Sequence, residues 1–337
     1  MTVNNNQGPS EKKEIPEEVP RQKEKKQGIP KHVYILIVVA MIMTSFASIL
    51  IRYAGKDAVD LGLETADASV IAFWRLFFAT IGMFIGTLLT RNLKEFKKVS
   101  LKDDIPLLSL SGLLLAIHFT TWNMSLQMTS VANSITIIYL MPFFALILSL
   151  IFLKERVSWS QFIAIILALV GAIMVGVSDF IVSDETGYFY GDLLALAGAI
   201  TGAGYFIIGR KKREKLDVFS YATIVYAFCT LFLLIYVLAN PITRGSIISG
   251  LKWQHFMFFG LLALGPSCLG HSLYNYSLGY IKAPVITVTA LGEMFGATLL
   301  AYGFFREVPF WTTFLGMTLV AIGIIITVIF ENKAIKE

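Results

Sequence analysis

The segment Trp122-Asn123-Met124-Ser125-Leu126 recurs later in the chain as Tyr274-Asn275-Tyr276-Ser277-Leu278, at an offset of 275 − 123 = 152 residues. Agreement at one fixed spacing is the sequence sign of an internal repeat, which decides how the rest of the chain is organised. No gap is needed to extend the match beyond these segments. The same offset relates three further pairs: Glu155 with Glu307, Trp159 with Trp311, and Gly171 with Gly323.

Composition places both halves in a membrane. Of the 337 residues, 56% are hydrophobic and 15% are charged, and the charged residues lie in a few short segments. Apolar segments of about 20 residues cross a bilayer as helices, because lipid offers the backbone no other hydrogen-bond partner. We therefore predict an all-α polytopic membrane protein with ten transmembrane helices. The predicted helices are 33–54, 68–90, 105–126, 131–153, 159–177, 188–209, 217–239, 255–279, 284–304 and 310–330.

Basic residues collect in alternate loops. The loops at 91–102, 154–156 and 210–215 are basic, whereas those at 57–67 and 179–185 are acidic. Basic loops are retained on the cytoplasmic side of a membrane. We therefore expect a multi-pass protein of the cell membrane with both termini in the cytoplasm. This distribution also accounts for the net charge of +5 and argues against nucleic acid as a partner.

The predicted domains are two five-helix repeats, residues 33–187 and 188–330. Residues 1–32 form a polar, charged tail that we expect to be disordered in the cytoplasm, and residues 331–337 form a second cytoplasmic tail. Because five is an odd number, the second repeat enters the membrane upside down relative to the first. Inverted repeats are found in many secondary transporters, which hold their substrate near the membrane midplane between the repeats.

Short motifs in both halves point to one family. They are Phe73-Trp74-Arg75-Leu76, Leu140-Met141-Pro142-Phe143 and the helix opening Gly191-Asp192-Leu193-Leu194-Ala195-Leu196. In this order, and with the paired glutamates Glu155 and Glu307, they resemble the drug/metabolite transporter superfamily, in particular its EamA-type members. The resemblance extends over about residues 33–330. It implies export of metabolites or amino acids, or efflux of drug-like compounds, without ATP.

Glu293 is the main candidate for a functional residue, because it lies about halfway along the predicted helix 284–304. A carboxylate at that depth is costly unless it is paired, protonated or facing water. We hypothesise that it lines a central cavity, where it binds a cationic or amine group or takes up a proton during coupling. A structural hydrogen bond to a neighbouring helix is the alternative. Gly292 and Gly296 would let another backbone come close, and Met294 stands where the family often has proline, so no proline kink is implied here.

Three other ionisable residues fall inside predicted helices. Arg75 could bind a carboxylate or phosphate of the substrate, or could extend outward to lipid phosphates and water. His118 and His271 are close to repeat-equivalent, one position out of register. They could relay protons, since histidine titrates near neutral pH, or could be ordinary hydrogen-bonded residues.

Proline and aromatic residues add three candidates. Pro142 is predicted to kink the helix at 131–153 at a depth equivalent to Glu293, where it either provides a flexing point or is merely tolerated. Tyr139 and Trp74 could belong to an aromatic wall around an amphiphilic substrate, together with Trp122, Tyr205, Tyr274 and Tyr276. Aromatic residues in the membrane interface are the alternative.

Repeat-related polar residues have simpler interpretations. Asn123 and Asn275 each lie near a helix end, where they could hydrogen-bond between helices or line the ends of a pathway. Glu155 and its repeat equivalent Glu307 stand beside basic residues, Lys154 in the first case, so a local ion pair or a helix cap explains them.

No motif for enzymatic chemistry occurs in the chain: His-Glu-x-x-His, Gly-x-Ser-x-Gly and the phosphate-binding Gly-x-x-x-x-Gly-Lys-Ser/Thr are all missing. We predict a secondary transporter, not an enzyme, that exports a small organic metabolite such as an amino acid or drug-like solute. No cofactor or metal is expected. The predicted partners are a small-molecule substrate and the lipid bilayer, while protons and a second copy of the chain remain open.

Two other functions remain compatible with the sequence. An organic anion or sugar-phosphate-like transporter or exchanger of the same fold would bind its solute through Arg75 and Lys282. A non-transporting membrane scaffold or sensor that has kept the fold is the second.

Overall fold

The computed structural model describes residues 29–128, 131–155, 157–180, 189–306, 308 and 311–336, and all regular structure within these ranges is helical. The all-α fold is confirmed. The disorder predicted for the N-terminal tail concerns mainly residues 1–28, which lie outside the described residues. The helices are α1 Lys31–Ser45, α2 Ala47–Ala54, η1 Lys56–Leu61, α3 Ala68–Leu89, η2 Asn92–Lys98, α4 Ile105–Met128, α5 Val131–Ile138, α6 Met141–Leu148, η3 Ser149–Leu153, α7 Trp159–Phe180, α8 Phe189–Arg213, α9 Val218–Ala239, α10 Trp253–Leu262, η4 Ala263–His271, α11 Ser272–Ser277, α12 Ala283–Ala290, α13 Glu293–Phe305 and α14 Trp311–Lys336.

Several of these helices join into rods long enough to span a bilayer. Among the described residues, eight helical segments are long and apolar enough to cross a membrane. The segments predicted at 131–153 and 159–177 yield shorter apolar helices, Met141–Leu153 and Trp159–Met174. The first of these is shorter because the helix is interrupted between α5 and α6. Eight of the ten predicted segments therefore meet the length and composition expected of a membrane span.

The offset of 152 residues reappears in the backbone. The first half is interrupted at residues 139–140, between α5 and α6, and the second half at residues 291–292, between α12 and α13. Lys154 and Arg306, also 152 residues apart, both adopt the left-handed conformation, with φ of 56° and 59°. Such a residue commonly ends a helix, although glycine usually occupies the position. The repeat seen in the sequence is therefore matched by equivalent helix interruptions and helix ends.

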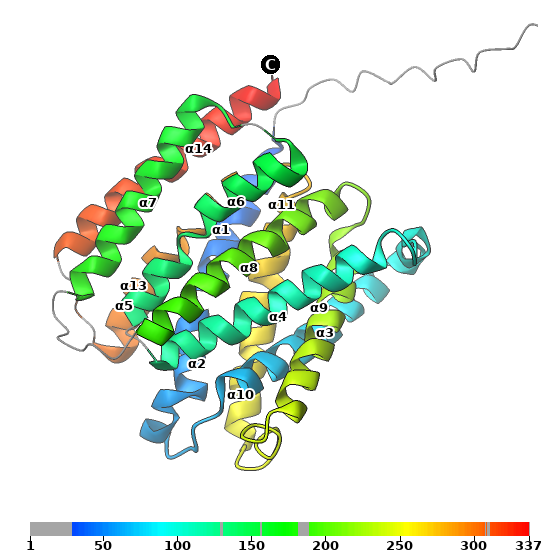
Figure 1. Cartoon of the computed structure of the whole chain (residues 1–337), viewed down its shortest axis with the longest axis vertical. Coiled ribbons are helices and arrows are strands. Elements are labelled where there is room, and N and C mark those ends of the chain that lie inside the picture. Colours follow the sequence, from blue (N-terminus) through cyan, green and yellow to red (C-terminus); the bar gives the residue numbers. More distant parts are fainter. Residues whose placement is uncertain are drawn as a thin grey trace, which may run out of the picture.

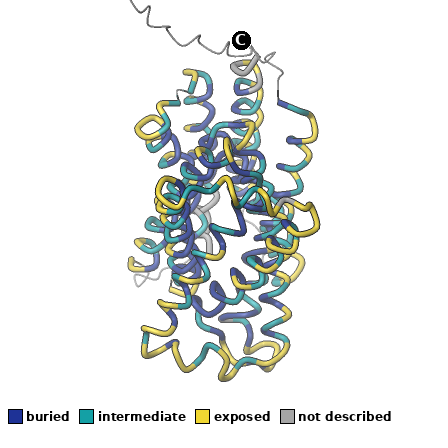
Figure 2. The backbone as a smooth tube through the Cα atoms, turned by 90° about the vertical axis from the view of Figure 1, so that its right-hand side faces the viewer, coloured by how far each residue is buried: buried dark blue, intermediate teal, exposed yellow. Residues whose placement is uncertain are grey.

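The helices form a bundle with an apolar exterior. α4 packs between α8 and α9, α3 packs on α9, and α1 packs on η4. α7 and α14 lie side by side at one edge and reach the bundle through α5 and α12 (Figure 1). Buried positions face the interior along the rods, whereas exposed ones follow the outer faces and the loops (Figure 2). Large apolar side chains on the outer faces, such as Ile35, Ile81, Ile163 and Ile325, suit contact with lipid.

Polar contacts join the helices at the end that carries the basic loops. Arg210 Nε donates to a carboxylate oxygen of Glu155 at 2.9 Å, and Arg210 Nη1 donates to the carbonyl oxygen of Leu278 at 2.7 Å. The local pair expected between Lys154 and Glu155 is therefore replaced by a link from the first half to α8. This link ties together segments that are far apart in the sequence.

Asp104 makes a second link at this end. Its carboxylate accepts hydrogen bonds from Lys212 Nζ at 2.7 Å and from Lys215 Nζ at 2.5 Å. The two ammonium groups hold the pKa of Asp104 well below its usual range. The start of α4 is thereby fixed to the end of α8.

Candidate functional site

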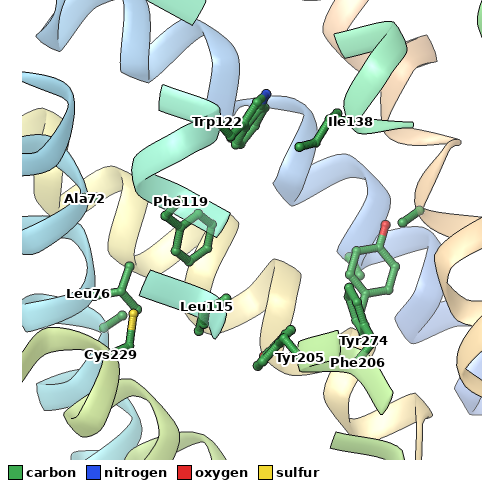
Figure 3. Packing of buried hydrophobic residues seen from close by; sticks show 14 of the residues in the cluster. Ala72, Leu76, Leu115, Phe119, Trp122, Ile138, Tyr205, Phe206, Cys229 and Tyr274 are labelled. Atoms are coloured by element: carbon green, nitrogen blue, oxygen red, sulfur yellow. The ribbon is translucent and has the colours of Figure 1, made fainter. Parts of the chain in front are cut away.

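A cavity of about 40 Å³ lies in the middle of the bundle. Four of the seven predicted site residues line it, namely Glu293, His118, His271 and Tyr139. Figure 3 shows Phe119 and Trp122 on one side of this region and Ile138, Phe206 and Tyr274 on the other. The full lining is Thr44, Ala47, His118, Trp122, Ile138, Tyr139, Met141, Phe206, His271, Tyr274, Thr287, Ala290, Leu291 and Glu293.

Glu293 stands at a helix break and not in the middle of a continuous helix. It is the first residue of α13, directly after the interruption at residues 291–292. Its side chain lines the cavity together with Thr44 and Tyr139. The helix therefore breaks here without the family's proline, and the break brings the carboxyl group to the cavity.

Glycines on either side of Glu293 let α1 approach closely. A Cβ atom added at Gly292 would lie 1.8 Å from Met41 Cε, and one added at Gly296 would lie 2.3 Å from Ser45 Oγ. The Ser45 hydroxyl donates to the carbonyl oxygen of Glu293 at 2.9 Å. The predicted close approach of a neighbouring helix is confirmed, and the neighbour is α1.

Pro142 marks the equivalent break in the first half. It lies in the first turn of α6, directly after the interruption at residues 139–140. Its ring cannot continue the preceding helix, because proline lacks the backbone N–H and clashes with the preceding turn. The predicted kink is present. Pro142 itself does not line the cavity, but its neighbours Tyr139 and Met141 do.

The two histidines lie at the cavity with different partners. His118 Nδ1 lies 2.8 Å from the carbonyl oxygen of Gly198, so Nδ1 carries a hydrogen and donates it. His271 Nδ1 is buried and has no hydrogen-bond partner. Its ring packs edge-on against Phe119, with ring centroids 5.2 Å apart. The Nδ1 atom of His118 therefore has a hydrogen-bond partner, whereas the Nδ1 atom of His271 has none.

Arg75 lies inside the protein and does not extend outward. Its side chain has no exposed surface, so the alternative of contact with lipid phosphates is wrong. Arg75 Nε donates to Ser267 Oγ at 2.7 Å, and the guanidinium lies 4.2 Å from the centroid of the Phe119 ring. Both Nη atoms are buried without a hydrogen-bond partner. Arg75 itself does not line the cavity, although the Phe119 ring that it contacts also packs against His271 of the lining.

The side chain of Trp74 does not reach the cavity. Its indole Nε1 donates to the carbonyl oxygen of Ile247 at 2.8 Å, and its ring packs edge-on against Phe256. Neither Ile247 nor Phe256 lines the cavity. An aromatic wall does exist, but Trp74 is not part of it.

Several lining residues were not singled out as candidates from the sequence. Thr44, Thr287 and Phe206 lie in apolar helices whose patterns do not show which face points inward. Trp122 and Tyr274, by contrast, belong to the aromatic wall that the sequence suggested. They are repeat equivalents, both line the cavity, and both carry a buried polar atom without a hydrogen-bond partner.

Comparison with known proteins gives consistent results. The EamA-like transporter family matches the chain at residues 31–177 and 189–329. The S-adenosylmethionine uptake transporter of Rickettsia bellii is 25% identical over 296 residues, covering 86% of this chain and 93% of that protein. The pseudopaline exporter of Pseudomonas aeruginosa is 24% identical over 291 residues, covering 86% and 94%. A solved crystal structure aligns with a TM-score of 0.70 at 13% identity, covering 91% of this chain and 99% of that one, which shows the fold alone.

Proposed function

The chain belongs to the EamA-like transporter family, and on this premise we propose that it is a secondary transporter that exports a small organic solute by alternating access. The observation that carries the proposal is the Glu293 carboxyl group, which follows a helix break and lines a central cavity among aromatic side chains. Concave sites of this kind, mostly apolar with a few polar groups, are typical of small-molecule binding. Glu293 alternates between a proton and a cationic group of the solute while the two halves rock around it.

The proposed topology is ten transmembrane helices in two inverted repeats, with both termini in the cytoplasm. Two groups of contacts support it. At one end, His32 Nε2 lies 3.1 Å from Tyr276 Oη and Lys282 Nζ lies 3.4 Å from Glu331, so the first and last helices meet the same loop. This is the end with the basic loops, as expected of the cytoplasmic side. At the other end, Lys252 donates to the carbonyl oxygen of Gly62.

The names of the relatives support a solute of metabolite size, but they indicate opposite directions of transport. One is named for uptake of S-adenosylmethionine and another for export of pseudopaline. Export is the direction we propose for this chain. Organic-anion transport is a second candidate, favoured by the two unpartnered Nη atoms of Arg75. Lys282 contributes little to it, because its amine lies beside Glu331.

Metabolite profiling tests the proposed function. We expect cells that express the wild type to accumulate one class of solute in the medium that cells with an empty vector do not. The measurement is untargeted mass spectrometry of medium and cell extract. A solute that rises only inside the cells would reverse the proposed direction. If cells with the wild type and cells with the empty vector have the same solutes in the medium and in the cell extract, the result would argue for the scaffold alternative.

Alternating access makes a second prediction, which starts from a difference between repeat-related residues. Asn275 Nδ2 donates to Tyr205 Oη near the basic end. The offset of 152 relates this pair to Asn123 and Tyr53, yet Asn123 Nδ2 donates to the carbonyl oxygen of Ala68 at 3.1 Å and its Oδ1 has no partner. A hydrogen bond therefore joins Asn275 to Tyr205, whereas the equivalent Asn123 bonds to Ala68 and not to Tyr53. In the opposite state the repeat predicts that Asn123 joins Tyr53 and that Asn275 releases Tyr205.

Matched Tyr→Phe variants test this exchange, since each removes one oxygen. Tyr205→Phe should shift the protein toward the state open at the basic end, and Tyr53→Phe should shift it away. One hydrogen bond of about 1 kcal/mol corresponds to about a fivefold change in population. The readout is the rate at which a Phe206→Cys reporter, in a background without Cys229 and Cys268, reacts with an impermeant maleimide from the cytoplasmic side. Shifts in the same direction, or none, would contradict the exchange.

A further inference from the structure

The turn from α3 into α4, at the edge of the bundle (Figure 1), carries a dense group of positive charges. Residues 91–102 contain five basic residues and one acidic residue. Lys98 Nζ lies 2.5 Å from a carboxylate oxygen of Glu95. The other four basic side chains are exposed and form no ion pair with a described residue. These four unpaired cations are Arg91, Lys94, Lys97 and Lys102.

The acidic residues that follow in the chain do not supply the missing counter-charge. Asp103 accepts a hydrogen bond from the Ser100 hydroxyl at 2.9 Å. The carboxylate of Asp104 is bound by Lys212 and Lys215. Like charges this close together repel one another. The four unpaired cations are therefore available to an anionic partner outside the chain.

The geometry of η2 arranges its side chains in rows. η2 is a 3-10 helix, which has three residues per turn, so side chains three residues apart lie above one another at a spacing of about 6 Å. The ion pair between Glu95 and Lys98 follows this rule. Lys94 and Lys97 form a second row, and the exposed side chain of Leu93 lies on the third side. η2 therefore presents a row of cations beside an exposed apolar side chain.

The neighbouring helices hold this turn at the membrane surface. α3 is long and apolar enough to span a bilayer and ends at Leu89, and α4, which is equally suited, begins at Ile105. The turn between them therefore starts and ends at the boundary between hydrocarbon and headgroups. Leu89 and Leu101 are 80% and 83% exposed. Leucines beside lysines at this level are typical of a segment that lies in the membrane interface.

The repeat shows that the fold of the turn does not require cations. In the equivalent turn of the second half, three of the unpaired cations are replaced by hydroxyl residues. These are Thr243, Ser246 and Ser249, opposite Arg91, Lys94 and Lys97. The Thr243 hydroxyl donates to the carbonyl oxygen of Val237 at 3.0 Å, and the Ser246 hydroxyl donates to that of Thr243 at 2.9 Å. These hydroxyl groups stabilise their own turn, whereas the cations make no such contact.

From these observations we propose that the turn 89–102 is a binding surface for anionic phospholipids of the surrounding membrane. The lipid phosphates bind the four unpaired cations, and Leu89, Leu93 and Leu101 contact the acyl chains. A soluble anion or an acidic protein would match the charge but would leave the three leucines uncovered. Orientation of the chain requires the positive charge alone, so the leucines are what make this surface specific for lipid. The proposal does not depend on the solute or on the direction of transport.

Competition between two lipids tests the proposal. The purified full-length protein receives equal amounts of dioleoylphosphatidylglycerol, which is anionic, and dioleoylphosphatidylcholine, which is zwitterionic. Native mass spectrometry then measures the ratio of bound phosphatidylglycerol to bound phosphatidylcholine. We expect the wild type to retain mainly phosphatidylglycerol. In Lys94→Gln/Lys97→Gln the ratio should fall by about fivefold for each lysine removed.

The matched control is Lys154→Gln/Lys211→Gln, which removes two exposed cations from the same end of the protein but outside the turn. It should keep the wild-type ratio. Leu93→Ser, which leaves the charge unchanged, should reduce the amount of phosphatidylglycerol bound. Size-exclusion chromatography checks that each variant is folded.

Three results would overturn the proposal. The first is equal retention of the two lipids by the wild type, and the second is an equal fall of the ratio in the two double variants. The third is displacement of phosphatidylglycerol by inorganic phosphate, which would indicate a site for a free anion. None of them bears on the proposed transport, which metabolite profiling tests separately.

Discussion

A Glu293→Gln variant is expected to lose solute transport by about 100-fold while the protein still folds and inserts. Glutamine has nearly the same shape as glutamate, but it can carry neither a negative charge nor a proton that exchanges during coupling. Among the described residues that line the cavity, Glu293 is the only acidic one. The substitution therefore removes the negative charge that a cation would pair with there.

The measurement is solute flux into proteoliposomes at several pH values, with size-exclusion chromatography as the check on folding. Glu293→Asp is the matched control: it keeps the carboxylate on a shorter side chain and should retain part of the flux and its pH dependence. Transport by Glu293→Gln with an unchanged rate and an unchanged pH dependence would show that the carboxylate is not the coupling group. The site would then have to be sought among the other polar residues of the cavity.

The internal repeat predicted more of the structure than any single motif. The interruption at residues 139–140 could be anticipated from Pro142, because proline cannot continue a helix. The equivalent interruption at residues 291–292 could not be anticipated in that way, since Met294 stands where the family often has proline. Glu293 was expected in mid-helix, but it is the first residue of α13. The offset of 152 places it directly opposite Met141, and that correspondence held where the proline argument did not apply.

The direction in which a side chain points was harder to predict than the helix that carries it. Arg75 was predicted to lie inside a helix, but that alone did not tell contact with lipid from burial beside Ser267. Trp74, its neighbour in the chain, points to Ile247 and not to the cavity. Helices inside a membrane are apolar on every face, so the sequence period does not show which face meets lipid and which meets protein. Side chains such as Thr44 could be assigned to the cavity only from the structure.

The pairing of α7 and α14 depends on glycines that the repeat relates, and replacing one of them is expected to have the largest effect on stability. A Cβ atom at Gly171 would lie 2.5 Å from the carbonyl oxygen of Gly316 and 2.8 Å from the amide nitrogen of Val320. A Cβ atom at Gly323 would lie 2.7 Å from the carbonyl oxygen of Ala164. Backbone atoms cannot turn aside as a flexible side chain can, so the two helices must separate to admit a larger residue.

Gly171→Leu should therefore destabilise the protein by about 3 kcal/mol, at the upper end of the cost of overpacking a close contact. The readout is the unfolding temperature in detergent, compared with Gly260→Leu, a control in α10 where an added Cβ meets no atom within 4 Å. Equal stability of the two variants would show that the α7–α14 contact is not tight. Because Gly171 and Gly323 act on one interface, Gly323→Leu should have a similar effect, and the double variant should lose less than the sum, since helices already separated by one leucine leave room for the second.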